Sequence, residues 1–250
     1  MERWSGRVAV VTGASAGIGA AIAQELVKKG LKVVGLARRV ERVQELETDL
    51  KSEPGQLFPL KCDVTKEHEV KEAFKWIDSS LGGVDILVNN AGVASDNSLS
   101  EGPVEHWRSI LDLNVLALSI CTKEALQSMK GRGLDDGHIV HINSIAGHGF
   151  PTRLFMYAAS KHAVTALTEG LRRELVNQKS RIRVSSVSPG RVKTEIVTAS
   201  KMRSITPENL YSNNPYLEAR DVAEAVLYVL GTPPHVQIQE LTLIPVGEGF

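Results

Sequence analysis

The chain has 250 residues and a formal net charge of zero, with 42% hydrophobic and 23% charged residues, a mixture typical of a globular protein with a sizeable core. This charge balance gives no reason to expect nucleic acid or an anionic membrane surface as a partner. Two widely separated cysteines, Cys62 and Cys121, argue against a disulfide framework and suit a reducing compartment. The sequence shows no secretory signal and no apolar run long enough to span a bilayer, so we expect a cytoplasmic protein.

Strand-like and helix-like segments alternate along the chain. Short β-branched runs predict strands at residues 7–12, 32–37, 57–61, 84–88, 138–143, 182–188 and 237–244. Helical patterns lie between them at residues 17–29, 40–51, 67–81, 104–130, 156–178 and 219–230. Several strands are apolar throughout, as strands buried on both faces of a parallel sheet are. The pattern predicts one α/β domain over residues 1–250, a doubly wound, Rossmann-like parallel sheet of about seven strands with helices on both faces.

The first strand is followed by the turn T-G-A-S-A-G-I-G at residues 12–19. Its three glycines, Gly13, Gly17 and Gly19, allow the backbone to turn tightly and approach a pyrophosphate at a helix N-terminus. Their spacing departs from the usual dinucleotide fingerprint, and the turn lacks the Gly-Lys-Ser/Thr of a P-loop. A purely structural turn is the alternative, but the position after the first strand favours cofactor binding.

A second group of polar residues follows the fifth predicted strand. Ser144 stands at the end of that strand, and Tyr157 and Lys161 lie four apart on the next helix, so they share one face. A cation beside a phenol favours the phenolate and lowers its pKa towards the working range. Ser144 can hydrogen-bond the same substrate oxygen. This chemistry moves a proton on and off an alcohol oxygen, so a cofactor must carry the hydride.

An ordered set of motifs runs through most of the chain. It comprises the glycine turn, N-N-A-G at 89–92, Asn114, Ser144, Y-A-A-S-K at 157–161 and P-G-R-V-K-T at 189–194. Together these motifs resemble the short-chain dehydrogenase/reductase family. Within it, L-A-L-S-I-C-T-K-E-A and D-D-G-H-I-V-H-I-N-S are most similar to the branch with the insect farnesol dehydrogenases and dehydrogenase/reductase family member 11.

The resemblance implies roles for individual residues. Tyr157 would be the catalytic acid/base, Lys161 its pKa tuner and a ligand of the nicotinamide ribose, Ser144 the group that orients the carbonyl, and Asn114 the holder of a proton-relaying water. Asp63 would bind the adenine amino group. The other cofactor contacts implied are Gly13, Ser15, Gly17, Ile18, Gly19, Asn90, Ala91, Gly92, Pro189, Gly190, Val192 and Thr194.

The end of the second strand, G-L-A-R-R at 35–39, bears on the choice of cofactor. An NAD site usually has an acidic residue here for the ribose 2′-hydroxyl, whereas arginine suits a 2′-phosphate. Ala37 stands at the expected acidic position, and Arg38 and Arg39 follow it. The arginines could instead lie at a solvated helix start, but the missing acid favours NADP(H) over NAD(H).

The histidines do not form a convincing metal site. His138 and His141 are three apart on a strand and should face opposite sides, and no cysteine or carboxylate joins them. We therefore expect no metal. His148, in the loop before Tyr157, is interpreted as facing substrate.

Residues 195–216 follow the P-G-R-V-K-T motif and contain scattered apolar side chains. Such a segment, beyond the carboxyl ends of the strands, could close over substrate as a lid, although an ordinary loop would read similarly. We expect Met202 and Tyr211 to form an apolar pocket with Phe150 and Phe155. Terpenoids such as farnesol, or steroids, fit this pocket better than sugars.

The sequence thus predicts an NADP(H)-dependent oxidoreductase that interconverts an apolar alcohol and its aldehyde or ketone. A non-catalytic, NADP(H)-sensing regulator of the same fold is the alternative, but it would not need Tyr157 and Lys161 at helical spacing with Ser144. By resemblance, a homodimer or homotetramer would form through the helices at 104–130 and 156–178.

Overall fold

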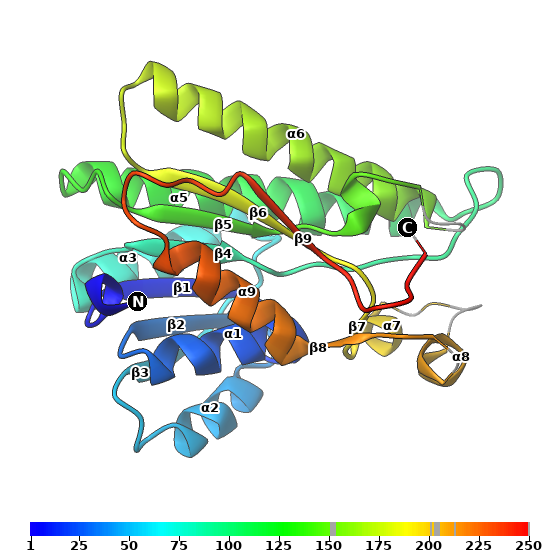
Figure 1. Ribbon diagram of the computed structural model, residues 1–250, viewed down its shortest axis with the longest axis horizontal. Coiled ribbons are helices and arrows are strands. Elements are labelled where there is room, and N and C mark those ends of the chain that lie inside the picture. The colour runs from blue at the N-terminus through cyan, green and yellow to red at the C-terminus, as the bar shows by residue number, and fades with distance from the viewer. Residues whose placement is uncertain (151–153, 201, 203–205, 213, 250) are drawn as a thin grey trace.

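The computed structural model describes residues 1–150, 154–200, 202, 206–212 and 214–249. Seven parallel strands form its sheet in the order β3-β2-β1-β4-β5-β6-β9 (Figure 1). Their bounds are β1 (Val8–Thr12), β2 (Lys32–Ala37), β3 (Gln56–Lys61), β4 (Ile86–Asn89), β5 (His138–Ile142), β6 (Arg183–Pro189) and β9 (Glu240–Leu243). The predicted α/β doubly wound fold is confirmed, and the order of strands reverses beside β1, where such sheets bind dinucleotides.

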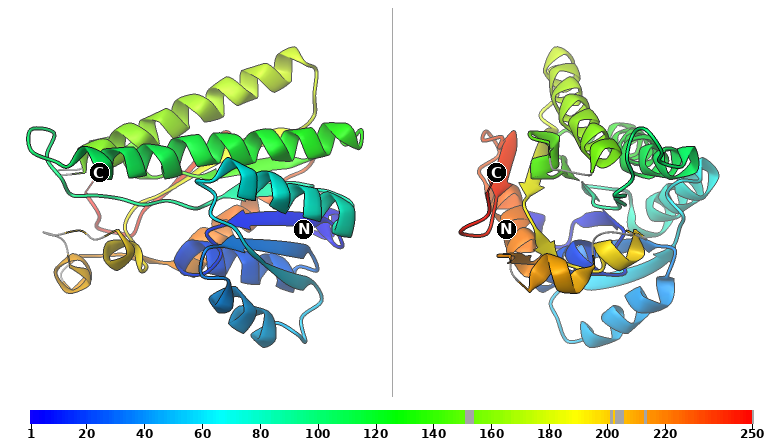
Figure 2. Two further views of the ribbon diagram at one scale, coloured as in Figure 1. Left: turned by 180° about the vertical axis from the view of Figure 1, so that it is seen from behind. Right: turned by 90° about the vertical axis from the view of Figure 1, so that its right-hand side faces the viewer.

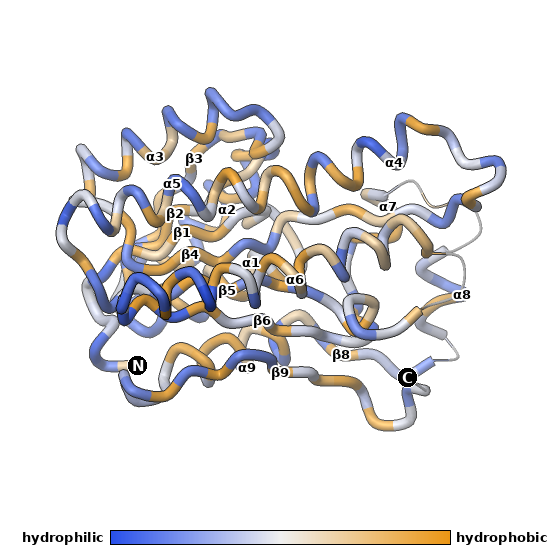
Figure 3. The backbone as a smooth tube through the Cα atoms, turned by 90° about the horizontal axis from the view of Figure 1, so that it is seen from above, coloured by the Kyte–Doolittle hydropathy of each residue, from blue (hydrophilic) through white to orange (hydrophobic). Residues whose placement is uncertain are grey.

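Helices cover both faces of the sheet (Figure 2). Those on one face are α1 (Gly17–Lys28), α2 (Val40–Asp49) and α9 (Ala219–Gly231), and those on the other are α3 (Glu67–Leu81), α4 (Val104–Leu111), α5 (Leu118–Gly131) and α6 (Phe155–Asn177). Alternate residues of β1 point to opposite faces: Ala9 and Val11 join the core beneath α1 and α9, whereas Val8 and Val10 join the core beneath α3 and α5. All five residues of β1 are buried, which explains its uninterrupted apolar sequence (Figure 3).

The helix predicted over residues 104–130 is interrupted. It consists of α4, a π-helical turn at Asp112–Ala117 and α5. The apolar periodicity continues through the turn, so the sequence pattern did not reveal it. Single π-helical turns inside α-helices occur frequently at functional sites.

The segment predicted to be a lid, residues 195–216, contains two short helices that the sequence did not indicate, α7 (Ile196–Ala199) and α8 (Pro207–Tyr211). Two short strands that pair with one another flank it, β7 (Val192–Lys193) and β8 (Leu217–Glu218). Thr206 caps α8 through a reciprocal pair of hydrogen bonds with Asn209. Residues 201, 203–205 and 213 of this segment lie outside the described residues.

Two further 3-10 turns, at Glu2–Trp4 and Ile145–Gly147, complete the described elements. No helix in the part of the chain that the structure describes is long and apolar enough to cross a membrane.

Candidate active site

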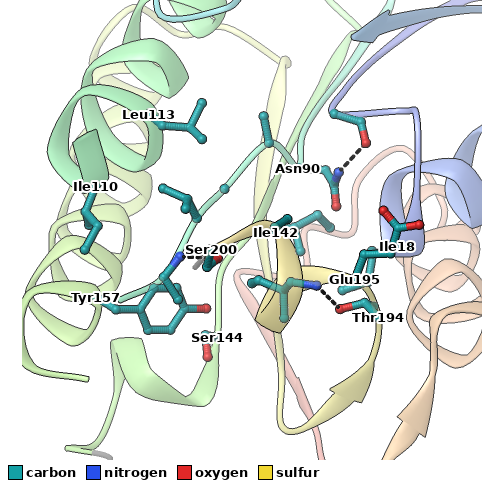
Figure 4. Close-up of a pocket in the computed structure, with 18 of the residues that line it drawn as sticks. Ile18, Asn90, Ile110, Leu113, Ile142, Ser144, Tyr157, Thr194, Glu195 and Ser200 are labelled. Carbon is teal, nitrogen blue, oxygen red and sulfur yellow. Dashed lines mark hydrogen bonds between the residues drawn. The ribbon is translucent and has the colours of Figure 1, made fainter. Parts of the chain in front are cut away.

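A cavity of about 1080 Å³ opens at the carboxyl ends of the strands, between β1, β4 and β5 on one side and α7 on the other (Figure 4). Its lining comes from the glycine turn, the ends of β2, β4, β5 and β6, the first turn of α6 and the segment around α7. This is the position that a doubly wound sheet provides for a dinucleotide.

The glycine turn is held against the end of β4. Gly13 has φ +69°, and a Cβ there would lie 3.0 Å from the Ala91 Cα atom, so only glycine fits without strain. The Thr12 hydroxyl accepts hydrogen bonds from the backbone N–H groups of Asn90 and Ala91, both at 3.0 Å. The Asn90 side chain donates in return to the Thr12 carbonyl at 2.9 Å. These contacts fix the floor of the cavity.

The predicted cofactor residues converge on this cavity, with one exception. Gly13, Ser15, Gly17, Ile18, Arg38, Arg39, Asp63, Asn90, Ala91, Gly92, Tyr157, Lys161, Pro189, Gly190, Val192 and Thr194 all line it. Gly19 does not, because it lies behind the turn, where a Cβ would collide with the Asn90 side chain and the Gly13 carbonyl. Its role in this arrangement is close packing of α1 against the turn.

Ser144 and Tyr157 face one another at the deep end of the cavity (Figure 4). Ser144 is buried directly after β5, and its hydroxyl accepts a hydrogen bond from the Ala146 N–H at 3.1 Å. Hydrogen bonding with Ser144 acts to lower the pKa of the Tyr157 phenol and so favours the phenolate. The two hydroxyls are therefore placed to contact a single substrate oxygen.

Lys161 is buried one helical turn after Tyr157. Its Nζ atom donates a 2.8 Å hydrogen bond to the Ile142 carbonyl and lies 5.8 Å from the centre of the Tyr157 ring. Burial lowers the pKa of Lys161 to about 8. The Lys161 ammonium thus lies near both the Tyr157 ring and the end of β5.

The sequence predicted that Lys161 lowers the pKa of Tyr157, whereas the net shift of this pKa is upward. Burial raises the pKa of Tyr157, and the hydrogen bond with Ser144 offsets this only in part. The physical reason is that burial disfavours the phenolate, while the lysine directs its Nζ atom to the Ile142 carbonyl.

Asn114 lies in the π-helical turn and is buried behind the cavity rather than in its lining. Its side-chain oxygen accepts from the Val93 N–H at 2.9 Å, and its amide group donates to the Val93 carbonyl at 2.9 Å and to the Ser160 hydroxyl at 3.0 Å. These bonds tie the loop after β4 to α6. Asn114 therefore fixes the distance between the glycine-rich side of the cavity and the helix that carries Tyr157.

The predicted substrate residues divide into two groups. Met202 and Tyr211 line the cavity, and the Tyr211 hydroxyl donates to the Val192 carbonyl at 3.1 Å. His148, Phe150 and Phe155 are not in its lining. His148 instead contacts the Ser188 hydroxyl at 3.0 Å and Glu240 at 3.2 Å, while Phe150 stacks on His162 with ring centres 5.0 Å apart. These three residues therefore lie outside the cavity, although Ile145, Ala146 and Leu154 nearby in the sequence line it.

Several apolar residues line the cavity that sequence reasoning did not single out, and among them are Ile110, Leu113 and Leu154. Ile110 and Leu113 come from the end of α4 and the π-helical turn, where an ordinary amphipathic helix was expected. The only sequence signal was their apolar character, which core packing explains equally well.

The remaining candidates are structural. Cys62 and Cys121 are buried thiols, and burial raises both of their pKa values to about 12. His138 contacts Ser185, whereas His141 contacts Thr168 beneath α6, so the two histidines face opposite sides of β5, as the alternation predicts. The described residues contain no group of three or more metal-binding side chains.

Comparisons with known proteins agree with this geometry. Residues 7–204 match the family described as short chain dehydrogenase. The chain belongs to this family. It is 53% identical to a farnesol dehydrogenase of Aedes aegypti, over the full length of both chains, and 50% identical to dehydrogenase/reductase SDR family member 11 of Bos taurus, over 98% of each.

Solved structures of short-chain dehydrogenases show the same fold with either nicotinamide cofactor. The closed form of a serine dehydrogenase complexed with NADP⁺ has a TM-score of 0.89 and 32% identity, covering 97% of this chain and 96% of that one. A short-chain dehydrogenase/reductase from Burkholderia phymatum in complex with NAD has a TM-score of 0.87 and 26% identity, covering 97% and 90%. The chain is therefore an oxidoreductase of this family that uses a nicotinamide cofactor.

Proposed function

We propose that this chain is an NADP(H)-dependent oxidoreductase that interconverts an apolar alcohol, such as a terpenoid or a steroid, with its aldehyde or ketone. One observation carries the proposal: Ser144, Tyr157 and Lys161 meet in a cavity whose other end is the glycine turn. The two ends of this cavity suit the two halves of the reaction, proton transfer at the hydroxyls and cofactor binding at the turn.

The chain's own residues supply the proton chemistry. In the reductive direction, the hydroxyls of Ser144 and Tyr157 would bind the carbonyl oxygen, and Tyr157 would donate its proton to that oxygen as the carbon is reduced. A raised pKa keeps the phenol protonated and suits it to this task. Lys161, held by the Ile142 carbonyl, would contact the nicotinamide ribose. A nicotinamide cofactor bound here would supply the hydride and, when oxidised, a positive charge that favours the phenolate.

The preference for NADP(H) rests on Arg38. This residue follows β2 directly, lines the cavity and is exposed, and no described residue forms an ion pair with it. Ala37, the last residue of β2, offers no acceptor for a ribose 2′-hydroxyl. A free guanidinium at this position matches the geometry of a 2′-phosphate.

The apolar character of the substrate rests on the lining near Tyr157. Ile110 and Leu113 lie on the Tyr157 side of the cavity (Figure 4), and Leu154, Val197 and Met202 also belong to its lining. A sugar would leave its hydroxyls without partners on such side chains, whereas an isoprenoid or steroid would bury apolar surface. The name of the 53% identical relative, farnesol dehydrogenase, points to the same substrate class.

The test is a matrix of two cofactors and a substrate panel. Reduction of three carbonyl compounds, farnesal, a steroid ketone and an aldose, is measured with NADPH and with NADH. Oxidation of farnesol is measured with NADP⁺ and with NAD⁺. We expect turnover of the apolar carbonyls with NADPH to exceed turnover with NADH by at least about tenfold in kcat/KM. Faster reduction of the aldose, or equal rates with the two cofactors, would contradict the proposal.

We also propose that subunits pair through α4, α5 and α6. Exposed apolar side chains on these helices and on the π-helical turn between α4 and α5 are Val104, Leu111, Leu116, Phe155, Leu167 and Val176. Light scattering at the elution peak should give the mass of a dimer or tetramer. A monomer over the whole micromolar range would contradict this pairing.

A further inference from the structure

An ion-pair cluster crosses the mouth of the cavity between two elements far apart in the sequence. Glu195, which immediately precedes α7, contacts Arg39 at 3.2 Å and Arg42 at 2.7 Å. Arg39 immediately precedes α2, and Arg42 lies in its first turn. The Glu195 carboxylate therefore connects the start of α7 to α2, the helix that follows β2.

The Glu195 carboxylate occupies the kind of position that a phosphate would take. The Arg42 Nη1 atom donates to both of its oxygens, at 2.7 and 2.8 Å, and Arg39 donates to one of them at 3.2 Å. All three side chains are between 40% and 46% exposed, so an anion in the cavity can reach them. Arg39 and Glu195 both belong to the cavity lining, beside Arg38.

The carboxylate and a 2′-phosphate would compete for these arginines. Because one nitrogen of Arg42 serves both oxygens of Glu195, a second anion could use only the other N–H groups of Arg42 while the pair is intact. A phosphate beside Glu195 would also place like charges together. The arginines hold the pKa of Glu195 below its usual range, so this carboxylate stays charged at neutral pH.

We propose that Glu195 is an internal competitor for the 2′-phosphate of NADP(H), and that Arg39 and Arg42 bind this phosphate once it displaces Glu195. The inference rests on the proposed NADP(H) preference and extends it from Arg38 to a three-arginine site with a built-in counter-ion. Glu195 lowers the affinity for the phosphorylated cofactor and leaves the affinity for the unphosphorylated cofactor unchanged.

The test uses two probes that differ only in the phosphate. Dissociation constants of adenosine 2′,5′-bisphosphate and of 5′-AMP are measured by titration calorimetry at fixed ionic strength for wild type, Glu195→Gln, Arg42→Ala and the double variant. Each exposed ion pair contributes little, so a moderate effect is expected. Glu195→Gln should bind the bisphosphate about threefold or more tightly, and Arg42→Ala should bind it about threefold or more weakly. Affinity for 5′-AMP should change less than twofold in all variants.

Glu169→Gln is the matched control, because Glu169 on α6 is also shared by two arginines, Arg172 and Arg173, at 2.6 Å each. It lies outside the cavity lining and should leave the affinities for both probes unchanged. In the double variant, removing Glu195 should give a smaller gain than it gives beside an intact Arg42, since coupled neighbours are not additive.

The outcomes separate the two claims. If wild type binds both probes equally, the NADP(H) preference itself fails, and this inference fails with it. If wild type prefers the bisphosphate but Glu195→Gln binds it equally or more weakly, the preference stands and the competition is wrong; Glu195 then only preorganises the arginines. A gain of the same size in Glu169→Gln would also overturn the inference, because a general charge effect would then explain it.

Discussion

The Nζ atom of Lys161 donates to the Ile142 carbonyl at 2.8 Å, which ties the face of α6 that carries Tyr157 to the end of β5. Ser144 stands two residues after Ile142, so this hydrogen bond links the two elements that carry the hydroxyls of Ser144 and Tyr157. The cost is a buried ammonium, and this burial lowers the pKa of Lys161 to about 8.

This burial predicts a pH-dependent difference in stability between wild type and Lys161→Met. Between pH 8 and the ordinary lysine value of 10.5, the unfolded chain holds a proton on Lys161 that the folded chain has released. The free energy of unfolding attributable to Lys161 should therefore rise with pH across this window, by a few kcal/mol at about 1.4 kcal/mol per pKa unit. Urea titrations of both proteins at pH 7.5, 9 and 10.5 measure it. Parallel pH curves for the two proteins would contradict the burial argument.

Ser144→Ala should change the pH dependence as well as the rate. The hydrogen bond with Ser144 lowers the pKa of Tyr157, so its loss should raise that pKa. Alcohol oxidation needs the phenolate, and its rising limb in a plot of kcat against pH should therefore move to higher pH. Loss of a hydrogen-bond donor at the substrate oxygen should also lower kcat by about 10²-fold. A limb that moves to lower pH would exclude this role.

Arg38→Ala should weaken NADPH binding by at least about tenfold, equivalent to 1.4 kcal/mol, because a charge-assisted pair with the 2′-phosphate is lost. NADH binding should change little. Adding Ala37→Asp should repel the phosphate and offer an acceptor to the ribose hydroxyl, which moves the preference further towards NADH. Fluorescence titration with both cofactors measures this ratio. An unchanged ratio in Arg38→Ala would make this arginine an ordinary surface residue.

Residues 195–216 should be among the most protease-sensitive parts of the ligand-free chain and should be protected by NADP(H) with an apolar substrate analogue. The reason is that only Val197 among the segment's described residues is buried, while polar bonds such as the one from the Ala94 N–H to the Ser200 hydroxyl at 3.0 Å connect the segment to the body. Mass-spectrometric mapping of limited digests locates the cuts. Cuts confined to other loops, or unaffected by saturating ligands, would rule out a lid.

The fold and the cofactor end of the cavity were predictable because strong local signals specify them. Apolar strands and the glycine turn at residues 12–19 are set by burial and backbone geometry, and the α/β alternation indicates a parallel sheet. Met202 and Tyr211 were also predicted to face the cavity, and they line it.

The other features of the site depend on contacts between residues that are far apart in the sequence, and such contacts produce no periodic pattern in it. The π-helical turn around Asn114 keeps an ordinary helical pattern, although the Asn114 side chain binds Val93 and Ser160 across the fold. Phe150 was expected in the pocket because it is aromatic and near Ser144, yet it is 84% exposed and stacks on His162. The raised pKa of Tyr157 follows from burial, which residue spacing alone does not reveal.

The most direct test of the proposed reaction is Tyr157→Phe, measured for NADPH binding and for NADPH-dependent reduction of farnesal in the same preparation. The change removes only the hydroxyl, so the fold and the NADPH dissociation constant should stay as in wild type. Turnover should fall by about 10²–10⁴-fold, the usual contribution of a general acid/base. A Phe variant that binds NADPH normally and keeps wild-type kcat would contradict the assignment of Tyr157 as the proton donor.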